Sequence, residues 1–346
     1  MPQRQRPRKW RQNDMPSILT IILNYKTAEM TLRSAEAALR EMADLDGEIV
    51  IVDNASGDGS FEVLQDHVAR NDWKRVRVVL SPHNGGFGAG NNIGLRLGLS
   101  DGSMPDYFYV LNSDAFPDKG SVSALVSYLE ANPSVGFAGS YIHGPDGEPH
   151  LTTFRFPSIA SELEGAARFG PISRALRNKR VPIDVPDHTR TVDWLAGASL
   201  MMRREVLEDI GLFDETFFLY FEETDLCRRA KLAGWPTVFV RESEVTHIGS
   251  VSTGMKTWAR MPQYWFNSRA HYFRKNHGWL YAVVAVKAHV IGGLLWRARR
   301  VLQGKPQADP DRFLRDLIVH DMRDLTRPRR RPSVSKLSDL MSVGET

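Results

Sequence analysis

Residues 107–118 read Tyr-Phe-Tyr-Val-Leu-Asn-Ser-Asp-Ala-Phe-Pro-Asp, and this stretch indicates an α/β fold. It begins as a short apolar run rich in aromatic residues, which is typical of a buried strand. It then breaks into Asn112, Ser113 and Asp114. In open α/β sheets, ligands bind at the edge where the carboxyl ends of the strands lie. Asp114 is therefore a candidate ligand-binding group, although Asn, Ser and Asp also favour ordinary turns.

Three earlier apolar runs, at residues 17–23, 48–52 and 76–80, alternate with helical patterns. Such alternation predicts a mainly parallel sheet, and largely apolar strands are those that helices cover on both faces. Each run ends in a polar or glycine-rich loop, so the loops should share one rim of the sheet. The rim residues are Asn24 and Tyr25 after the first run, Asp53 after the second, and Asn84, Gly86 and Asn91 after the third. This layout predicts a nucleotide site.

Two common nucleotide-binding motifs do not occur in the sequence. A dinucleotide fold needs G-x-G-x-x-G after its first strand, but the glycines here follow the third run with a G-x-G-x-x-x-G spacing. There is also no G-x-x-x-x-G-K-[ST] phosphate loop. Asp53 remains as an acceptor for a base or a ribose. The backbone and amide donors of residues 86–92 could approach a nucleotide closely, because glycine permits it.

Three acids, Glu222, Glu223 and Asp225, crowd the first turn of a helix that should end at Gly234. The helix dipole favours anions there, so simple capping is one interpretation. The aromatic run at residues 217–221 indicates instead a largely apolar pocket, in which carboxylates have perturbed protonation.

The region between these motifs has two further features. Trp194 opens a strand-like run within residues 191–204, whereas residues 141–186 have a weaker pattern, with a helical patch near 161–177, that allows a mobile lobe on the acceptor side. His247 follows a short strand expected at 237–240, from where it could reach back to Asp114.

Composition limits the compartment and the partners. A single cysteine, Cys227, excludes an intrachain disulfide framework and fits a reducing, cytoplasmic setting. The formal charge of +4 gives no reason to expect a nucleic-acid partner. Basic residues gather near both termini, which predicts solvated tails or contact with an anionic membrane. No apolar segment typical of a secretory signal follows the basic N-terminus.

Taken in order, these motifs resemble the family 2 glycosyltransferases of the GT-A fold (nucleotide-diphospho-sugar transferase fold), over about residues 17–255. The resemblance is closest to a rhamnosyltransferase-like branch that builds cell-surface polysaccharide. The segments that carry it are Ile22–Tyr25, Val52–Ser60, Asn84–Asn92, Leu111–Asp114, Trp194–Ala198, Tyr220–Cys227 and His247.

The resemblance implies an inverting transfer of a sugar, with rhamnose as a candidate, from a dTDP- or UDP-linked donor to a saccharide or polyprenyl-linked acceptor. Asp114 and His247 would hold Mg²⁺ or Mn²⁺ on the donor diphosphate. Glu223 would be the general base, with Glu222 or Asp225 as alternatives, and Trp194 would stack on a sugar unless it is a core indole. The implied nucleotide-sugar-binding residues are Asn24, Tyr25, Asp53, Asn84, Gly86, Asn91, Asn112 and Ser113.

Two departures from the family pattern keep other functions open. Asn112 stands where the first acid of the family's D-x-D element is usual, and Glu223 stands where an aspartate is usual. These departures allow a non-catalytic sugar-nucleotide-binding relative. A nucleotidyltransferase is the other alternative, with Lys26 alone as a phosphate-binding cation near the first strand.

The chain is expected to comprise a basic disordered tail at 1–15, a catalytic domain at 16–255, a helical extension at 256–325 and a second disordered tail at 326–346. Residues 281–302 are apolar but carry Lys287, His289 and Arg297, and so fall short of a clean membrane span. They predict either a helix packed on the catalytic domain or an interfacial helix on an anionic membrane. The second choice predicts a peripheral protein on the inner face of the cytoplasmic membrane.

Overall fold

The computed structural model describes residues 15–249, 258–325 and 332–337. Its centre is a parallel sheet of four strands in the order β3-β2-β1-β4. These strands are β1 (Ile18–Asn24), β2 (Gly47–Asp53), β3 (Val76–Leu80) and β4 (Tyr107–Asn112). All four were expected from the apolar runs, with bounds that agree within one residue. The expected basic tail at 1–15 lies almost wholly outside the described residues.

The sheet continues past β4 with strands of mixed direction. β10 (Ser199–Arg203) runs antiparallel between β4 and β6 (Phe137–His143), and β11 (Thr237–His247) runs parallel to β6. β5 (Ala115–Pro117) and β8 (Arg190–Val192) both pair antiparallel with β11. A separate pair joins β7 (Thr153–Phe154) to β9 (Trp194–Leu195). The expected run at 191–204 is therefore three short strands in two sheets, and the strand expected at 237–240 extends to His247.

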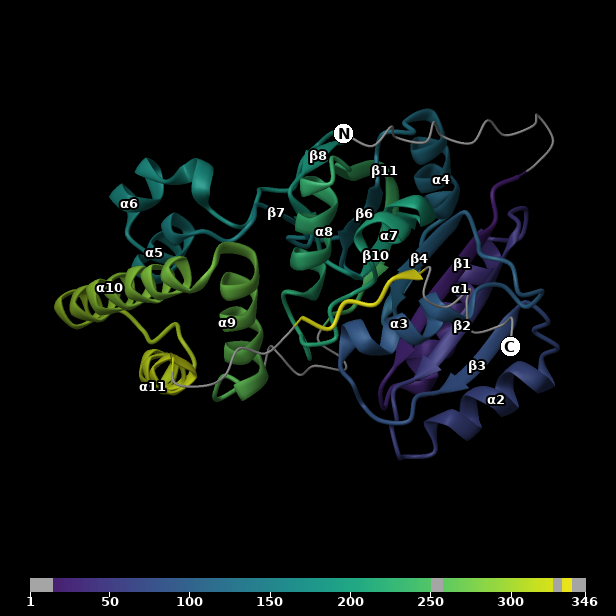
Figure 1. Cartoon of the computed structure of the whole chain (residues 1–346), viewed down its shortest axis with the longest axis horizontal. Helices are drawn as coiled ribbons and strands as arrows, with labels where there is room; N and C mark the ends of the chain where they lie inside the picture. The colour runs from purple at the N-terminus through teal and green to yellow at the C-terminus, as the bar shows by residue number, and fades with distance from the viewer. Residues whose placement is uncertain (1–14, 250–257, 326–331, 338–346) are drawn as a thin grey trace.

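Helices cover both faces of the sheet (Figure 1). One core joins the sheet to α1 (Ala28–Glu41), α2 (Ser60–Arg70) and α4 (Ser121–Ala131). The other joins it to α3 (Phe87–Leu97), α7 (Arg204–Ile210) and α8 (Glu222–Leu232). Alternate side chains of β1 enter opposite cores, Ile18 and Ile22 one of them and Leu19 and Ile21 the other. This double burial explains why the strand runs are apolar throughout.

The remaining helices form a unit at one end of the molecule (Figure 1). They are α5 (Ile159–Ala167), α6 (Gly170–Ala175) with a 3₁₀ turn at Arg177–Lys179, α9 (Gln263–His277), α10 (Trp279–Gln303) and α11 (Phe313–Leu325). α5 and α6 lie in the weakly patterned stretch of the sequence. Because α5 packs on α10, the helical unit is built from two separated segments of the chain.

Part of the C-terminal tail is ordered, contrary to the expectation of disorder from residue 326. Residues 332–337 lie along the domain that is built on the sheet, in yellow in Figure 1, and Leu337 is fully buried in the same core as α3 and α8. The Leu212 amide donates to Ser335 O at 3.0 Å, and the Glu215 amide donates to Ser333 O at 3.0 Å. One apolar side chain and a few backbone bonds therefore fix a segment whose composition is polar.

Candidate active site

The ends of β1 and β2 meet in a buried polar cluster. Asn24 Nδ2 donates to Asp53 Oδ2 at 2.6 Å, and the Ser56 hydroxyl donates to the same oxygen at 2.7 Å. Asp53 Oδ1 accepts from the Ser56 amide at 2.9 Å. Asn24 Oδ1 accepts from Thr31 Oγ1 at 2.7 Å. Both residues therefore shape the turn after β2, and Tyr25 lies half-buried beside them.

The end of β4 brings three sequence-predicted residues together. His247 Nε2 lies 3.1 Å from Asp114 Oδ1 and 3.4 Å from Asn112 Nδ2. The contact arises because β5 and β11 pair with His247 opposite Ala115, next to Asp114 in sequence. Ser113 is buried in the same turn and accepts from Thr27 Oγ1 at 3.4 Å. The carboxylate, the imidazole and the amide therefore converge at one corner of the rim, and their role in holding an ion stays a prediction.

His150 is a further histidine at this corner that the sequence reasoning did not identify. Its ring lies 5.9 Å from the His247 ring, centroid to centroid. No local pattern marks it, because it reaches the corner through the loop after β6.

The loop after β3 is held by the protein itself. Gly86 has φ +88°, and a Cβ there would lie 1.8 Å from Phe218 O, so only glycine permits this approach. The next amide, of Phe87, donates to Phe218 O at 2.9 Å. Asn84 Oδ1 accepts from the Gly86 amide at 3.0 Å. We expected the backbone and amide donors of residues 86–92 to approach a nucleotide. In the structure, Gly86 and the Phe87 amide hold this loop in close contact with Phe218 of the aromatic run.

Asn91, a predicted nucleotide-sugar-binding residue one turn into α3, uses only part of its side-chain amide for hydrogen bonds to the described residues. Its Nδ2 donates to Phe87 O at 2.9 Å, inside its own helix. Its buried Oδ1 has no hydrogen-bond partner among the described residues. The start of α3 therefore holds one buried acceptor that no described residue satisfies.

Glu222 and Glu223 open α8 in contrasting environments. Glu222 is buried, and neither of its carboxylate oxygens has a hydrogen-bond partner within the described part of the chain. Burial raises the pKa of Glu222 well above its ordinary value, and the charge of Glu223 raises it further. Glu223 is partly exposed, and its Oε1 accepts from the Gly197 amide at 3.2 Å. Burial raises the pKa of Glu223 as well. The pair therefore combines a buried carboxyl, whose protonated form burial favours, with a partly exposed carboxyl that an amide orients.

Gly197 and Ala198 connect the acids to the β4 corner. The Gly197 amide binds Glu223, and the next carbonyl, of Ala198, accepts from the Asn112 amide at 3.0 Å. Glu223 and Asn112 are thus anchored to adjacent residues of one loop between β9 and β10. The structure therefore places the two predicted halves of the site on one rim.

Asp225, the other alternative base, is occupied elsewhere. It is fully buried, and its Oδ2 accepts from Lys275 Nζ at 2.7 Å and from Arg229 Nε at 2.9 Å. Its Oδ1 accepts from Asn276 Nδ2 at 3.0 Å. These contacts join α8 to α9, so Asp225 is a structural anion and is poorly placed as a base.

Aromatic side chains surround the entrance to α8. Tyr220 lies 5.9 Å from Trp258 and 6.3 Å from Tyr264, and Phe218 lies 5.4 Å from Tyr264, between ring centroids. Trp258 and Tyr264 come from the chain before and within α9, beyond the motifs that the sequence offered. They were missed because single aromatic residues outside a motif give no signal.

Trp194, the residue expected to stack on a sugar, is partly buried against protein. Its ring stacks on Phe154 at 4.1 Å between centroids, and its Nε1 donates to Arg155 O at 3.0 Å. The ring face against Phe154 is therefore occupied.

A second cluster of possible metal ligands lies just after β5 and on β6 and β11. The ligand atoms of Asp118, His143 and Glu244 all lie within 4.8 Å of one another. His143 Nε2 is 2.9 Å from Asp118, and His143 Nδ1 is 2.8 Å from Gly144 O, so both ring nitrogens already have acceptors. Glu244 pairs with Arg241 at 2.5 Å. Internal pairing explains this cluster without an ion.

Comparison with known proteins gives a consistent picture. Residues 17–211 match the family model described as "Glycosyl transferase family 2". The chain is 28% identical over 275 residues to an N-acetylglucosaminyl-diphospho-decaprenol L-rhamnosyltransferase of Mycobacterium tuberculosis, covering 73% of this chain and 86% of that protein. A mannosyltransferase of Pyrobaculum calidifontis, solved with GDP-Man and Mn²⁺, superposes with a TM-score of 0.55 at 15% identity, over 91% of this chain and 82% of that one. GalNAc-T7, solved with UDP, GalNAc and Mn²⁺, superposes with a TM-score of 0.52 at 13% identity, over 95% of this chain and 56% of that one.

Proposed function

The chain belongs to glycosyl transferase family 2, and from that premise we propose that it transfers a sugar from a nucleoside-diphosphate donor to a lipid-linked saccharide. It is a glycosyltransferase with a GT-A fold. Rhamnose is the proposed sugar and dTDP or UDP the proposed carrier, because the similar mycobacterial protein is named as a rhamnosyltransferase acting on a decaprenol-linked sugar. The nucleotidyltransferase and non-catalytic alternatives are not favoured by this family.

The donor is proposed to bind along the rim from Asp53 to Asp114. The hydrogen-bonded turn of Asn24, Asp53 and Ser56 shapes one end of this rim, and the start of α3 adds the buried Oδ1 of Asn91, which no described residue satisfies. A divalent ion would be held by Asp114 and His247, with Asn112 beside them. Their carboxylate, imidazole and amide donors converge within hydrogen-bond distance, and this donor set suits Mn²⁺ and also Mg²⁺. When bound, such an ion neutralises charge that develops on the leaving diphosphate.

Glu223 is proposed as the general base, and its position carries the functional proposal. Its carboxylate is partly exposed, is oriented by the Gly197 amide, and lies one residue along the loop from the anchor of Asn112. It would take the proton of the acceptor hydroxyl as that oxygen attacks the anomeric carbon opposite the diphosphate, which inverts the anomeric centre. A raised pKa makes Glu223 a stronger base than an exposed glutamate.

Glu222 would stay protonated behind it. A neutral Glu222 avoids placing a second negative charge beside Glu223 in a buried site. The aromatic cluster of Phe218, Tyr220, Trp258 and Tyr264 is the proposed acceptor platform, because aromatic faces pack on sugar rings. A lipid-linked acceptor would place the enzyme peripherally on the inner face of the cytoplasmic membrane.

A thermal-shift screen of nucleotide sugars, with and without Mn²⁺, tests the donor and the ion together. A ligand that binds only the folded state raises its melting temperature. We expect a shift from one nucleotide sugar that increases with Mn²⁺, and little shift from Mn²⁺ alone, because Asn112 brings no charge to the site. Release of nucleoside diphosphate in the presence of an acceptor would establish transfer, whereas pyrophosphate as the product would refute it.

Asp114→Ala and Asp118→Ala form a matched pair for locating the ion. Asp114→Ala should abolish the Mn²⁺-dependent part of the shift, and Asp118→Ala should retain it. The reverse result would move the ion to the cluster of Asp118, His143 and Glu244.

A further inference from the structure

The face of α10 that points away from the protein is apolar. Its residues at positions 280, 284, 291, 294, 298 and 301 fall at helical spacings of three, four or seven, and so form one stripe along the helix. The large side chains of this face are exposed by 69% at Leu280, 61% at Ile291, 55% at Leu294, 76% at Val301 and 85% at Leu302. A surface helix normally turns polar residues outward. This stripe therefore needs a partner.

The opposite face of α10 is packed against the helical unit. A Cβ at Gly292 would lie 2.7 Å from Leu163 O, so α10 and α5 are in close contact. Tyr281 Oη accepts from the Ile159 amide at 3.2 Å, and His289 Nδ1 lies 2.8 Å from Glu162 Oε2. One side of the helix is thus used by the fold, and the described residues leave the large apolar side chains of the other side exposed.

The charge along this segment has one sign. Residues 279–308 contain no aspartate or glutamate, whereas five cations occur there: Lys287, Arg297, Arg299, Arg300 and Lys305. Arg297 donates to Gly293 O at 3.1 Å and Arg300 to Gln307 Oε1 at 3.1 Å, and neither of these acceptors is charged. The cations therefore keep a net positive charge at the edge of the stripe.

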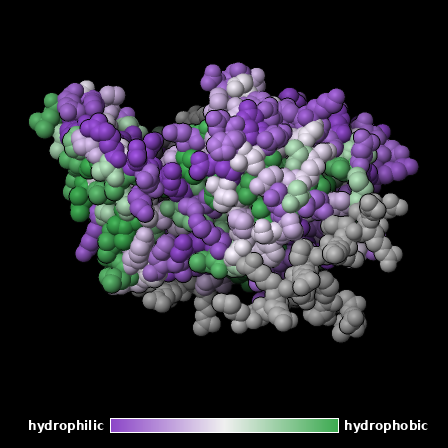
Figure 2. Space-filling model, turned by 90° about the horizontal axis from the view of Figure 1, so that it is seen from above, coloured by the Kyte–Doolittle hydropathy of each residue, from purple (hydrophilic) through white to green (hydrophobic). Residues whose placement is uncertain are grey.

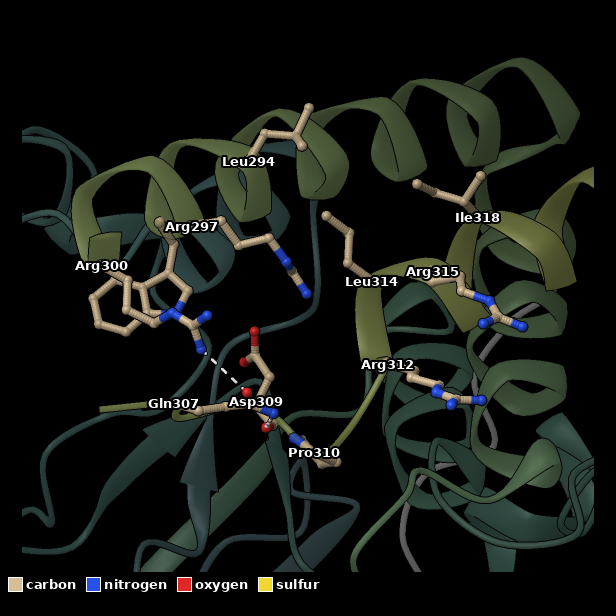
Figure 3. A pocket seen from close by; sticks show the side chains of 11 residues that line it. Leu294, Arg297, Arg300, Gln307, Asp309, Pro310, Arg312, Leu314, Arg315 and Ile318 are labelled. Carbon is tan, nitrogen blue, oxygen red and sulfur yellow. Dashed lines mark hydrogen bonds between the residues drawn. The ribbon is translucent and has the colours of Figure 1, made fainter. Parts of the chain in front are cut away.

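A pocket beside the stripe is lined by two of these cations and by two further arginines. It has a volume of about 390 Å³ and is lined by Leu294, Arg297 and Arg300 from α10 and by Arg312 and Arg315 from the start of α11 (Figure 3). Its one acid, Asp309, is paired with Arg168 at 2.8 Å. Arginine guanidinium groups beside an apolar wall suit the phosphate groups of lipids.

A second hollow lies between α9, α10 and α11 and is largely apolar. It has a volume of about 370 Å³, with Val283, Val286, Val290 and Ile291 of α10 facing Ile318 and Met322 of α11. The hydropathy surface shows hydrophobic residues gathered at this helical end of the molecule (Figure 2). The apolar surface therefore continues from the stripe onto α11, where Met322 is also exposed.

We propose that the outer face of α10, together with the arginine pocket at α11, docks on an anionic lipid bilayer. Leu280, Ile291, Leu294 and Val301 would enter the boundary between head groups and acyl chains, while the arginines bind lipid phosphates. Lys287, in the middle of the stripe, can extend its amine to the head groups while its stem stays apolar. This inference rests on the proposed function, whose lipid-linked acceptor it would bring within reach, but lipid binding is measurable without catalysis.

The packing indicates that α10 lies on the membrane rather than crossing it. By length and composition, α10 qualifies as a membrane span, which differs from the expectation that the stretch falls short of one. However, the buried guanidinium of Arg269 lies beneath it, paired with Glu162 at 2.5 Å and with Asp321 at 3.5 Å. Crossing the bilayer would carry this ion network and its helices into hydrocarbon, at a high cost in free energy.

Sedimentation of the full-length protein with vesicles tests the proposal. We expect binding to vesicles that contain phosphatidylglycerol, weaker binding to pure phosphatidylcholine vesicles, and a decrease as salt is raised. The double variant Ile291→Glu/Leu294→Glu should lower the partition coefficient at least tenfold. Its matched control is Val63→Glu/Leu232→Glu, at residues 52% and 72% exposed on α2 and α8, which should bind as the wild type does.

A second pair of variants tests the charges. Arg297→Gln/Arg300→Gln should weaken binding several-fold on anionic vesicles and change it little on neutral ones, whereas Arg40→Gln/Arg70→Gln on α1 and α2 should have no effect. Unchanged melting temperatures would show that the variants are folded. Equal binding by the Ile291/Leu294 variant and the wild type would overturn the proposal. So would a wild-type dimer that this variant disperses, without vesicle binding, because a second copy would then cover the stripe.

The outcome can be separated from that of the proposed function. Resistance of the bound protein to carbonate washing would refute the peripheral position and favour a spanning helix. Transfer to a water-soluble acceptor should be unaffected by either α10 variant. We therefore expect the α10 variants to lose vesicle binding and to retain transfer to the water-soluble acceptor. A wild-type protein that bound vesicles but transferred no sugar would count against the proposed function alone.

Discussion

At the scale of single residues, the acids at the start of α8 are distinguished by what each one touches. Glu223 accepts from a backbone amide and is partly exposed, whereas Glu222 is buried with no hydrogen-bond partner among the described residues. Asp225 is paired with both Lys275 and Arg229. The sequence shows three equivalent carboxylates in one helical turn. Choosing among them requires Gly197 and Lys275, which are 26 and 50 residues away from their partners and appear in no local pattern.

Substitution of the two glutamates by glutamine should separate their roles. Glu223→Gln removes the proposed base and should lower turnover by about 10²- to 10⁴-fold. Glu222→Gln should retain most of the turnover, because an amide resembles the protonated carboxyl that burial favours there. Steady-state release of nucleoside diphosphate measures both. Loss of activity in Glu222→Gln with activity kept in Glu223→Gln would exchange the assignment.

The same variant makes a prediction about stability and pH. The pKa of Glu222 is raised in the folded state above its ordinary value of 4.5. The protonated form therefore favours the fold below that value, and this contribution is lost as the pH rises through the raised pKa. Glu222→Gln, which cannot ionise, should gain in free energy of unfolding relative to the wild type as the pH rises. Urea unfolding across the pH range measures the difference, and a constant difference would contradict the raised pKa.

At the scale of helices and strands, the sequence was informative where one periodicity ran unbroken. The four parallel strands were predicted within about a residue, since each strand is buried on both faces and most of its positions must therefore be apolar. The run at 191–204 was misjudged as one strand, because Asp193 and the turn at Gly197 divide it between two sheets. Local hydrophobicity does not report which partner strand a segment will find.

The contact between α8 and α9 gives a prediction at this scale. Asp225→Asn would leave Lys275 and Arg229 without one of their buried anions, which costs about 3–5 kcal/mol in free energy of unfolding. The exposed pair of Asp66 and Arg70 provides the control: Asp66→Asn should cost less than about 1 kcal/mol. Denaturant melts of both variants test the comparison. Turnover per folded molecule should fall less than tenfold in Asp225→Asn, and a far larger loss would restore Asp225 as a candidate base.

The stability of the helical unit in acid should depend on Glu162. Although burial opposes ionisation, the Arg269 charge and a hydrogen bond from His289 lower the pKa of Glu162 to about 2. A lowered carboxyl pKa contributes stability above the ordinary value of 4.5, and that contribution is lost as the pH falls towards 2. Glu162→Gln should therefore cost most at neutral pH and progressively less in acid. Thermal melts at stepped pH measure this, and an equal cost at every pH would contradict it.

At the scale of the whole molecule, long-range assembly was the part that sequence could not supply. The sequence motifs matched a catalytic domain in order, but they gave no indication that α5 would join α10 or that residues 332–337 would return to the catalytic domain. Both events depend on the shape of the folded chain: Gly292 lies close to a backbone carbonyl of α5, and Leu337 is buried in the core that α3 and α8 share. A single leucine in a polar tail carries no signal until its cavity is known.

The returning C-terminal segment gives the last prediction. It binds the loop before the aromatic run, where the Ser333 amide donates to Asp214 Oδ1 at 2.8 Å, and it binds α3, where Arg96 donates to Ser335 Oγ at 2.6 Å. Leu337→Ala should lower the free energy of unfolding by about 2–5 kcal/mol, because a fully buried leucine leaves a cavity. Leu232→Ala, at a residue 72% exposed, should cost far less.

The same segment should also influence the site, because the loop that it holds leads into Phe217–Phe221 and Glu222. Deleting residues 332–346 should therefore raise the KM for the donor or acceptor more than it lowers kcat, since Glu223 is oriented separately by Gly197. Kinetics at a temperature where the shortened protein remains folded make the comparison. If the free energy of unfolding fell while KM and kcat both stayed at wild-type values, the segment would stabilise the fold without influencing substrate binding.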